Sequence, residues 1–327
     1  MRYVLRRLGF FLVTLWACLT INFALPRLMP GNPAIAMMSR FKGRINGQAL
    51  KALEIAFGVN SSESAIRQYF TYLSNTITGH FGVSLTFFPD QVSRVVFSAL
   101  PWTLGLVGTT TVLAFLAGTL IGLGSAWRRG GLLDSLLPPI FVIVSAFPYF
   151  FLALMGLLFF AVDLHWLPQG FGYSNTDTPN LSWHYIGDVL SHAILPALVI
   201  LVTSIGGWVL TMRNNMISTL SEDYVRIARA KGLSPLRIMF AYAGRNAILP
   251  NLTGFAMSLG FVVSGAILVE YVFDYPGIGY MLLQAVENED YALMQTLFLF
   301  ITVAVLVAVL VMDFVTMALD PRTRSQG

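Results

Sequence analysis

Six apolar runs decide what this chain can fold into. They span residues 8–25, 100–127, 136–162, 189–212, 248–272 and 293–319. Each is near or above the roughly 20 residues that an α-helix needs to cross a bilayer. Hydrophobic residues make up 56% of the chain and charged residues only 11%, whereas about a quarter of the residues in a soluble domain are charged. We therefore expect an all-α polytopic membrane protein with six transmembrane helices and with both termini on one side of the bilayer.

The first run follows a basic start and so also resembles a secretory signal peptide. No small-residue cleavage site follows the run, and Pro26, Arg27 and Pro30 come next instead. We interpret residues 1–28 as a retained first transmembrane helix with a cytoplasmic N-terminus.

Basic residues beside the runs cluster on one side of the predicted membrane. These 13 residues are Arg2, Arg6, Arg7, Arg128, Arg129, Arg213, Arg226, Arg229, Lys231, Arg237, Arg245, Arg322 and Arg324. Residues 163–188 and 270–290, on the other side, contain no lysine or arginine. Because cytoplasmic loops carry an excess of both, we place residues 213–249, both termini and the tail 320–327 in the cytoplasm. This topology explains the net charge of +4 without a nucleic-acid partner.

The cytoplasmic segment 213–249 contains six basic and two acidic residues. At roughly 3 kcal/mol for each lysine or arginine, burying six of them at the bilayer centre would cost on the order of 18 kcal/mol, so the segment lies in water. Its local signals predict two short helices. Ser221 is expected to cap the start of the first helix and Gly232 to end it in a left-handed conformation. Ser234 and Pro235 begin the second helix, which must end or kink before Pro250.

The first of these helices has the composition of a docking surface. We expect it to expose Tyr224, Val225, Ile227 and Ala228 among the cations of the loop. A helix, a glycine break and a second helix of this kind favour a loop that receives a partner protein.

Residues 29–99 form an extracytoplasmic module in this topology. Ser62 is expected to cap a helix that ends at Gly79 and places four apolar residues on one face, namely Ile66, Phe70, Leu73 and Ile77. A shorter helix is expected over residues 48–57. The module could be a lid that stabilises the outer helix ends, or it could also contact a delivery protein.

The loop 270–290 combines turn residues with apolar ones. Pro276, Gly277 and Gly279 predict a tight turn, and Ile278 and Leu282 after it would be misplaced in open water. Irregular backbone at membrane depth is tolerated where it is buried in protein or lines a cavity. We therefore favour a segment that dips back into the protein over an ordinary surface turn.

Several kinds of chemistry are missing from the sequence. None of the three lysines lies in the Gly-Lys-Ser/Thr context of a phosphate-binding loop, so we expect no ATP site on this chain. The single cysteine, Cys18, excludes an intrachain disulfide, and the four histidines lack metal-ligand spacing. We predict no catalytic residue, no metal site and no bound cofactor on this chain.

An ion-coupled carrier is the alternative function, and a membrane scaffold is a third. Ion-coupled carriers place ionisable residues within their spans, whereas Glu270 and Asp313 lie towards the ends of theirs. A scaffold would not need the basic loop. Transport energised by an external ATPase fits the sequence best.

Residue patterns along most of the chain carry a family resemblance. In the basic loop they are Asp223, Tyr224, Val225, Arg226, Ala228, Arg229, Ala230, Lys231, Gly232, Leu233, Arg245, Asn246, Ala247 and Pro250. Elsewhere they include Pro30, Gly31, Pro33, Leu100, Pro101, Asp134, Pro196, Glu270, Phe273, Pro276, Gly277, Gly279, Asp290 and Asp320. These patterns resemble the permeases of type I ABC importers of the peptide/nickel family, which also includes oligosaccharide importers. The loop departs from the Glu-Ala-Ala consensus of ABC importers at Arg226, Ile227 and Ala228, as is usual in this branch.

The resemblance implies a permease core over residues 100–319 and a set of partners. These are a second homologous permease, two cytoplasmic ATPase subunits that bind ATP and Mg²⁺, an extracytoplasmic substrate-binding protein and the lipid bilayer of a prokaryotic plasma (inner) membrane. The implied ATPase-docking residues are Tyr224, Arg226, Ala228, Arg229, Lys231 and Gly232. The implied gate residues are Phe273, Pro276, Gly277 and Gly279.

A substrate path is implied more weakly, at Trp208, Phe147 and Tyr149. Trp208 could stack on a sugar or anchor a helix at an interface. The substrate stays open between peptides, oligosaccharides and nickel chelates. Whether the binding protein is lipid-anchored or periplasmic stays open as well.

Overall fold

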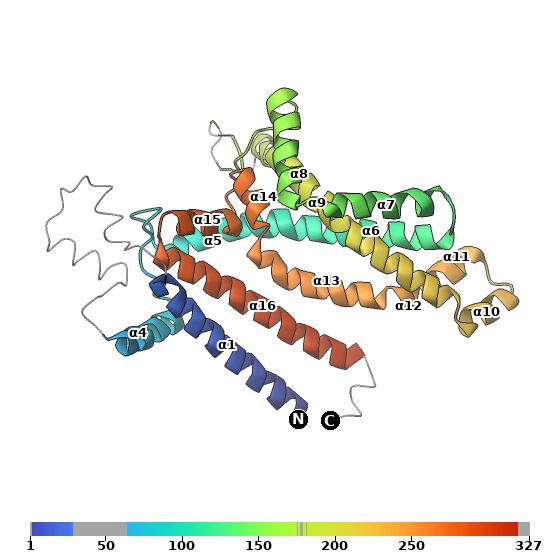
Figure 1. Cartoon of the computed structure of the whole chain (residues 1–327), viewed down its shortest axis with the longest axis horizontal. Coiled ribbons are helices and arrows are strands. Elements are labelled where there is room, and N and C mark those ends of the chain that lie inside the picture. Colours follow the sequence, from blue (N-terminus) through green and yellow to red (C-terminus); the bar gives the residue numbers. More distant parts are fainter. Residues whose placement is uncertain (1, 29–63, 175, 177–178, 181, 320–327) are drawn as a thin grey trace. The chain divides into compact units, whose positions relative to one another are not determined.

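The computed structural model describes residues 2–28, 64–174, 176, 179–180 and 182–319 (Figure 1). In this part of the chain the regular elements are helical, apart from one isolated antiparallel bridge between Val83 and Gln91. The longer α-helices are α1 (Arg2–Leu28), α4 (Ala65–Thr78), α5 (Val92–Thr103), α6 (Thr109–Trp127), α7 (Leu132–Ala146), α8 (Tyr149–Gly156), α9 (Trp183–Leu220), α10 (Asp223–Ala230), α13 (Leu249–Phe261), α14 (Ile267–Val272), α15 (Ile278–Glu287) and α16 (Tyr291–Leu319). The all-α prediction is confirmed. The helix expected over residues 48–57 lies outside the described residues.

Four described helices are long and apolar enough to cross a membrane, over Leu5–Leu25, Val92–Trp127, Trp183–Leu220 and Tyr291–Val311. Two bent helix pairs are also long and apolar enough, if each pair is taken together. Leu132–Val144 with Tyr149–Asp163 is bent by 92°, and Pro235–Ala247 with Leu249–Ser264 is bent by 52°. The predicted six spans are reached if each bent pair is one span. The run predicted over residues 248–272 is not one helix, because α13 gives way to a short 3₁₀ segment and then to Gly265, whose φ is +72°.

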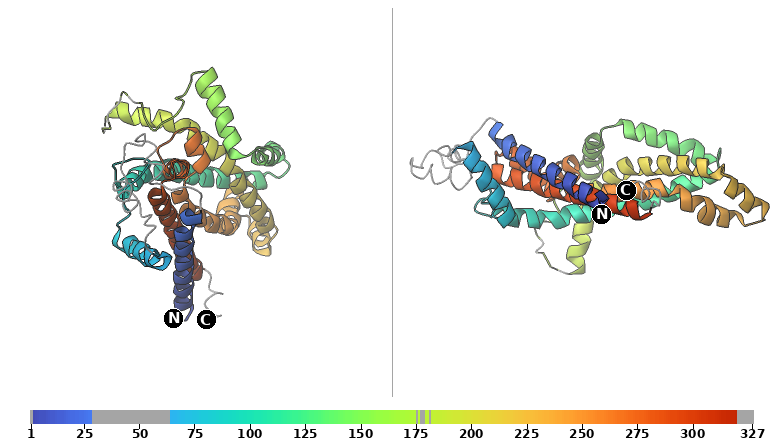
Figure 2. Two further views of the ribbon diagram at one scale, coloured as in Figure 1. Left: turned by 60° about the vertical axis from the view of Figure 1, so that its left-hand side comes forward. Right: turned by 90° about the horizontal axis from the view of Figure 1, so that it is seen from below.

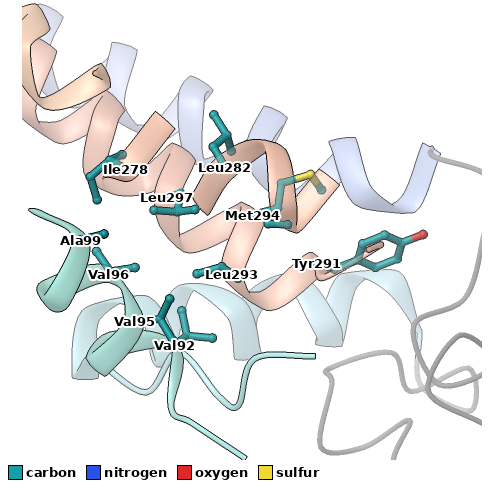
Figure 3. Packing of buried hydrophobic residues seen from close by; sticks show 11 residues of the cluster. Val92, Val95, Val96, Ala99, Ile278, Leu282, Tyr291, Leu293, Met294 and Leu297 are labelled. Atoms are coloured by element: carbon teal, nitrogen blue, oxygen red, sulfur yellow. The ribbon is translucent and has the colours of Figure 1, made fainter. Parts of the chain in front are cut away.

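The described chain divides into two compact units. Unit 1 comprises residues 1–103, 263–267 and 276–327, and unit 2 comprises residues 104–262 and 268–275. The core of unit 1 is an apolar cluster at which α5, α15 and α16 meet (Figure 3). Val92, Val96, Ile278, Leu293 and Leu297 in this cluster are fully buried.

In unit 1 the first and last long helices run side by side in opposite directions (Figures 1 and 2). Asn22 Nδ2 donates to the carbonyl oxygen of Gln295 over 2.7 Å, and Gln295 Nε2 donates to the carbonyl oxygen of Asn22 over 3.1 Å. The start of α1 and the end of α16 therefore lie towards the same side, as an even number of spans requires.

In unit 2 the 38-residue helix α9 packs along α6. The approach is close because two glycines of α6 face it. A Cβ atom at Gly118 would lie 2.5 Å from Cβ of Trp208, and one at Gly122 would lie 2.5 Å from the carbonyl oxygen of Val209. Small residues at such crossings let helix backbones approach closely in membranes.

Two predicted helix caps are wrong. Ser64 caps α4, with its side chain accepting from the amide of Arg67, where Ser62 had been expected. Ser221 ends α9 instead of starting the next helix, and its hydroxyl donates to the carbonyl oxygen of Ser218 over 2.7 Å. The physical reason is that α9 continues eight residues past the predicted run, to Leu220, before it ends. The predicted left-handed end of α4 at Gly79 is confirmed by a φ of +75°.

Candidate coupling loop and gate segment

The coupling loop, residues 213–249, contains a short helix with a well-formed C-terminal cap. Gly232 has a φ of +71°, as predicted. Its amide donates to the carbonyl oxygen of Arg229 over 2.9 Å, and the amide of Leu233 donates to that of Ala228 over 3.3 Å. This pair of bonds is a Schellman motif with glycine at the left-handed position. It reverses the chain directly after α10, so that the second helix can start at Ser234 and Pro235, as predicted.

One face of α10 is buried inside unit 2. Val225 is fully buried and Ala228 is 2% exposed, and both belong to a cluster with Met212 and Met216 of α9 and Ala243 of the second loop helix. The prediction that Val225 and Ala228 are exposed is therefore wrong, because residues three apart on a helix share a face and here that face holds the helix on unit 2. Ala228 packs α10 against the rest of unit 2 and is too buried to contact a docking partner.

The other face of α10 is open. Tyr224 is 38% exposed and Ile227 is 55% exposed, and Arg226, Arg229, Lys231 and Gly232 are exposed beside them. The Tyr224 hydroxyl accepts from Nδ2 of Asn246 over 2.8 Å, which fixes the ring. Leu236 and Phe240 of the second helix add exposed apolar surface. The loop thus presents aromatic and aliphatic side chains beside five exposed cations, three at α10 and, in the second helix, Arg237 and Arg245.

The second loop helix is irregular. It begins with Pro235–Arg237, continues as a π-helix over Ile238–Gly244 and returns to α-helix over Arg245–Ala247. The bend of 52° follows, before Leu249–Ser264. The predicted end or kink before Pro250 is confirmed.

An ion pair that was not predicted from the sequence links α9 to α7 where this loop begins. Nε of Arg213, on α9, donates to Oδ1 of Asp134, on α7, over 2.5 Å. Ser125 of α6 donates to the same oxygen over 3.2 Å, and the Gly130 amide donates to Oδ2 over 2.9 Å. The Asp134 side chain is only 7% exposed. Three helices of unit 2 thus meet at one carboxylate, at the first residue of the loop.

The candidate gate segment, residues 273–279, begins with a buried turn in unit 2. Phe273 is 1% exposed and Tyr275 is 3% exposed. The Asp274 amide donates to the carbonyl oxygen of Tyr271, and the Tyr275 amide donates to that of Glu270 over 2.8 Å. Burial, together with the nearby Glu270 carboxylate, raises the pKa of the Tyr275 phenol to about 12, so Tyr275 stays protonated.

A second chain segment of unit 2 is fastened to this turn. The Phe171 amide donates to the carbonyl oxygen of Phe273 over 2.8 Å. A Cβ atom at the neighbouring Gly170 would lie 2.6 Å from that oxygen. Glycine at position 170 is what lets the two backbones approach this closely.

The prediction that Pro276, Gly277 and Gly279 form the tight turn is wrong. The left-handed residue of the turn is Asp274, with a φ of +46°. Gly277 is extended and precedes α15, and Gly279 lies within α15. In unit 1, the amide of Ile278 donates to Oγ1 of Thr103 over 2.7 Å and satisfies one donor at the start of α15. The apolar residues after the turn are buried in protein, as predicted, with Ile278 fully buried and Leu282 5% exposed.

The three side chains predicted for a substrate path are not gathered by one element. Trp208 lies on α9 and packs edge-on against Phe115 of α6, with ring centroids 5.6 Å apart. The Trp208 ring also lies close to Gly254 of α13, where an added Cβ atom would be 3.3 Å from the ring. These contacts place Trp208 in the packing of α9 against α6 and α13. Phe147 and Tyr149 flank the break between α7 and α8 and are 55% and 40% exposed. Among the described residues, no group of three histidine, cysteine or acidic side chains could hold a metal ion.

The architecture is that of a multi-pass helical membrane protein, and comparison with known proteins identifies its family. Residues 118–325 match the family described as binding-protein-dependent transport system inner membrane component. The chain is 32% identical over 340 residues to the di/tripeptide transport system permease protein DppB of Pseudomonas aeruginosa, with 99% of each protein covered. It is 33% identical over 324 residues to a putative peptide permease protein of Brucella suis biovar 1, with 99% of each covered. It is 30% identical over 320 residues to the oligopeptide transport system permease protein AppB of Bacillus subtilis, with 98% of each covered.

The chain therefore belongs to the family of inner membrane components of binding-protein-dependent transport systems, the permeases of ABC importers. The resemblance recognised in the sequence is confirmed, and the comparisons give no support to an ion-coupled carrier.

Proposed function

We propose that this permease forms half of an ATP-driven import path for peptides. The observation that carries the proposal is the coupling loop, whose short capped helix is seated on α9 and presents Tyr224, Ile227 and three cations outwards. Relatives over the full chain are named peptide permeases, which supports peptides over oligosaccharides or nickel chelates as the substrate class.

The proposal assigns the energy source to partner proteins. Two cytoplasmic ATPase subunits bind ATP and Mg²⁺, and a second permease completes the path. The loop of this chain, at Tyr224, Arg226, Arg229 and Lys231, docks on the ATPase subunits together with the matching loop of the second permease. A substrate-binding protein delivers the peptide from outside, and residues 29–99 form the extracytoplasmic module. A short helix between two stiff elements can pass a rigid-body movement of the ATPases to the spans. The gate is proposed at Phe273 and, further along the chain, at Pro276, Gly277 and Gly279.

The function is tested by ATP hydrolysis of the purified complex in proteoliposomes. Di- to pentapeptides, cello-oligosaccharides and manno-oligosaccharides are each added with the delivery protein, and a complex with hydrolysis-inactive ATPase subunits serves as the control. We expect peptides alone to stimulate hydrolysis and to accumulate in the lumen. Stimulation by oligosaccharides alone would reassign the substrate. Uptake driven by a proton gradient without ATP would overturn the importer assignment.

The proposed orientation has a separate test. Cys18→Ser removes the single cysteine, after which Ser234→Cys and Ser182→Cys each introduce one reporter. In intact cells, an impermeant maleimide should label position 182 and spare position 234 until the membrane is opened. The reverse pattern would invert the topology without touching the substrate assignment.

A further inference from the structure

The helix α4 is fastened to the C-terminal end of α1 within unit 1 (Figure 1). Tyr69 Oη lies 2.8 Å from Oγ1 of Thr20, and Tyr72 Oη accepts from Nδ2 of Asn22 over 3.1 Å. Both tyrosine rings contact Phe23, at centroid separations of 5.1 and 5.6 Å. One face of α4 is thus held by two aromatic side chains against residues 20–23.

This attachment fixes the level of α4 relative to the bilayer. The apolar span of α1 ends at Leu25, and α4 touches α1 from Thr20 to Arg27, where Nη2 of Arg27 donates to Oε1 of Gln68 over 3.1 Å. The Arg27 guanidinium lies over the Phe23 ring, 3.6 Å from its centroid. Tyrosine and arginine at a span end are typical of the boundary between lipid and water. The helix therefore lies at that boundary.

A second face of α4 is apolar and open. Ile66 is 72% exposed, Phe70 is 64% exposed and Ile77 is 86% exposed, and Leu73 lies in the same stripe. At 3.6 residues per turn, this stripe lies about a quarter of the way round the helix from Tyr69 and Tyr72. The remaining face carries exposed polar side chains, and these are Arg67, Thr71, Ser74 and Thr78.

We infer that α4 lies flat on the bilayer surface beside α1, with Ile66, Phe70 and Ile77 inserted at the boundary between headgroups and acyl chains. A helix packed sideways on an upright span has one flank turned towards the lipid, and the apolar stripe stands a quarter turn from the packed face. Amphipathic helices bind membranes in this way, through an apolar face with cationic residues at its margin.

Lipid suits this surface better than a protein partner does. The exposed Ile21 and Leu25 of α1 belong to the same stretch of sequence as the residues that hold α4, and they are part of the apolar surface that a spanning helix presents to the bilayer, so this level of α1 is in lipid. The helix contains one cation, Arg67, and no acidic residue, which suits anionic headgroups. Within the described part of the chain no side chain of α4 is buried.

The inference is tested with spin labels on the full chain in phosphatidylcholine and phosphatidylglycerol liposomes. In the Cys18→Ser background, Phe70→Cys and Ile77→Cys place a label on the stripe, and Thr71→Cys and Ser74→Cys place matched labels on the polar face. Power saturation compares collisions with oxygen, which concentrates in lipid, and with a water-soluble nickel chelate. We expect oxygen to exceed nickel several-fold at positions 70 and 77, and the reverse at positions 71 and 74.

Three outcomes overturn the inference. Access of nickel to positions 70 and 77 would place the stripe in water. Exclusion of both reagents would bury the stripe against protein, and immobilisation of the labels only when the delivery protein is added would make it a docking surface. The measurement needs neither ATP nor substrate, so its result is independent of the proposed function.

Discussion

Arg213 of α9 and Asp134 of α7 form an ion pair across 79 residues of sequence, with Nε and Oδ1 2.5 Å apart. Removing one partner of a buried pair leaves a charge without compensation, which costs about 3 kcal/mol or more. We expect Asp134→Asn to lower the stability of the purified permease by this order, measured by thermal unfolding in detergent.

The double variant Asp134→Asn with Arg213→Gln is the control for this pair, because it removes both charges. It should recover a large part of the loss, since neutral partners of similar size carry no isolated charge. The single variant Arg213→Gln completes the comparison. If the stability loss in the double variant equalled the sum of the losses in the two single variants, the ion pair would not couple α7 to α9.

Gly232→Val should uncouple ATP hydrolysis from transport. The φ of +71° is strained for a β-branched residue by about 1–2 kcal/mol, so α10 would have to lose its Schellman cap. No atom lies within 4 Å of the position of a Cβ, so the effect is one of backbone conformation alone. Gly232→Asn, which tolerates the left-handed region, should retain most of the transport. Equal transport by the valine variant and the wild type would contradict a docking role for α10.

Gly122→Ala should weaken the contact between α6 and α9. The added Cβ would lie 2.5 Å from the Val209 carbonyl oxygen and 2.9 Å from Cβ of Met212, and overpacking of this kind costs about 1–3 kcal/mol. Gly124→Ala on the same helix meets no atom within 4 Å and should be neutral or slightly stabilising. The midpoint of thermal unfolding separates the two variants, and similar midpoints would refute the close packing.

Gly170→Ala should disturb the turn at Phe273 without unfolding the chain. Its Cβ would meet the Phe273 carbonyl oxygen at 2.6 Å and displace the hydrogen bond from Phe171. We expect the transport rate to fall several-fold and a cysteine at Phe273 to react faster with maleimide. Gly187→Ala, in an open helical position, serves as the control. Unchanged rates in both assays would separate this contact from the gate.

Much of the fold could be predicted because its causes are local. Runs of apolar residues predict spanning helices wherever they occur, and the conformations of Gly79 and Gly232 follow from the absence of a Cβ. Pro235 likewise starts a helix for a reason contained in its own ring. Such signals need no knowledge of what packs nearby.

The errors arose where tertiary packing decides. Ser221 has the chemistry of an N-cap, but packing extends α9 up to it, so the residue ends one helix instead of starting another. Val225 and Ala228 could be assigned to the buried or the open face of α10 only once the Met212 and Met216 surface was known. The pair of Asp134 and Arg213, and the approach of Gly170 to Phe273, join residues whose separation in sequence carries no periodic signal.

The reciprocal hydrogen bonds between Asn22 and Gln295 can form only late in the synthesis of the chain. The two residues are 273 positions apart, so at about 5–20 residues per second the first helix waits on the order of 10–60 s for its last partner to be made. During that interval Asn22 Nδ2 can already donate to Tyr72 Oη, which lies only 50 positions further along the chain. The contact between the first and the last helix therefore forms only when the last one has been made, and a nascent chain truncated before residue 295 would lack it.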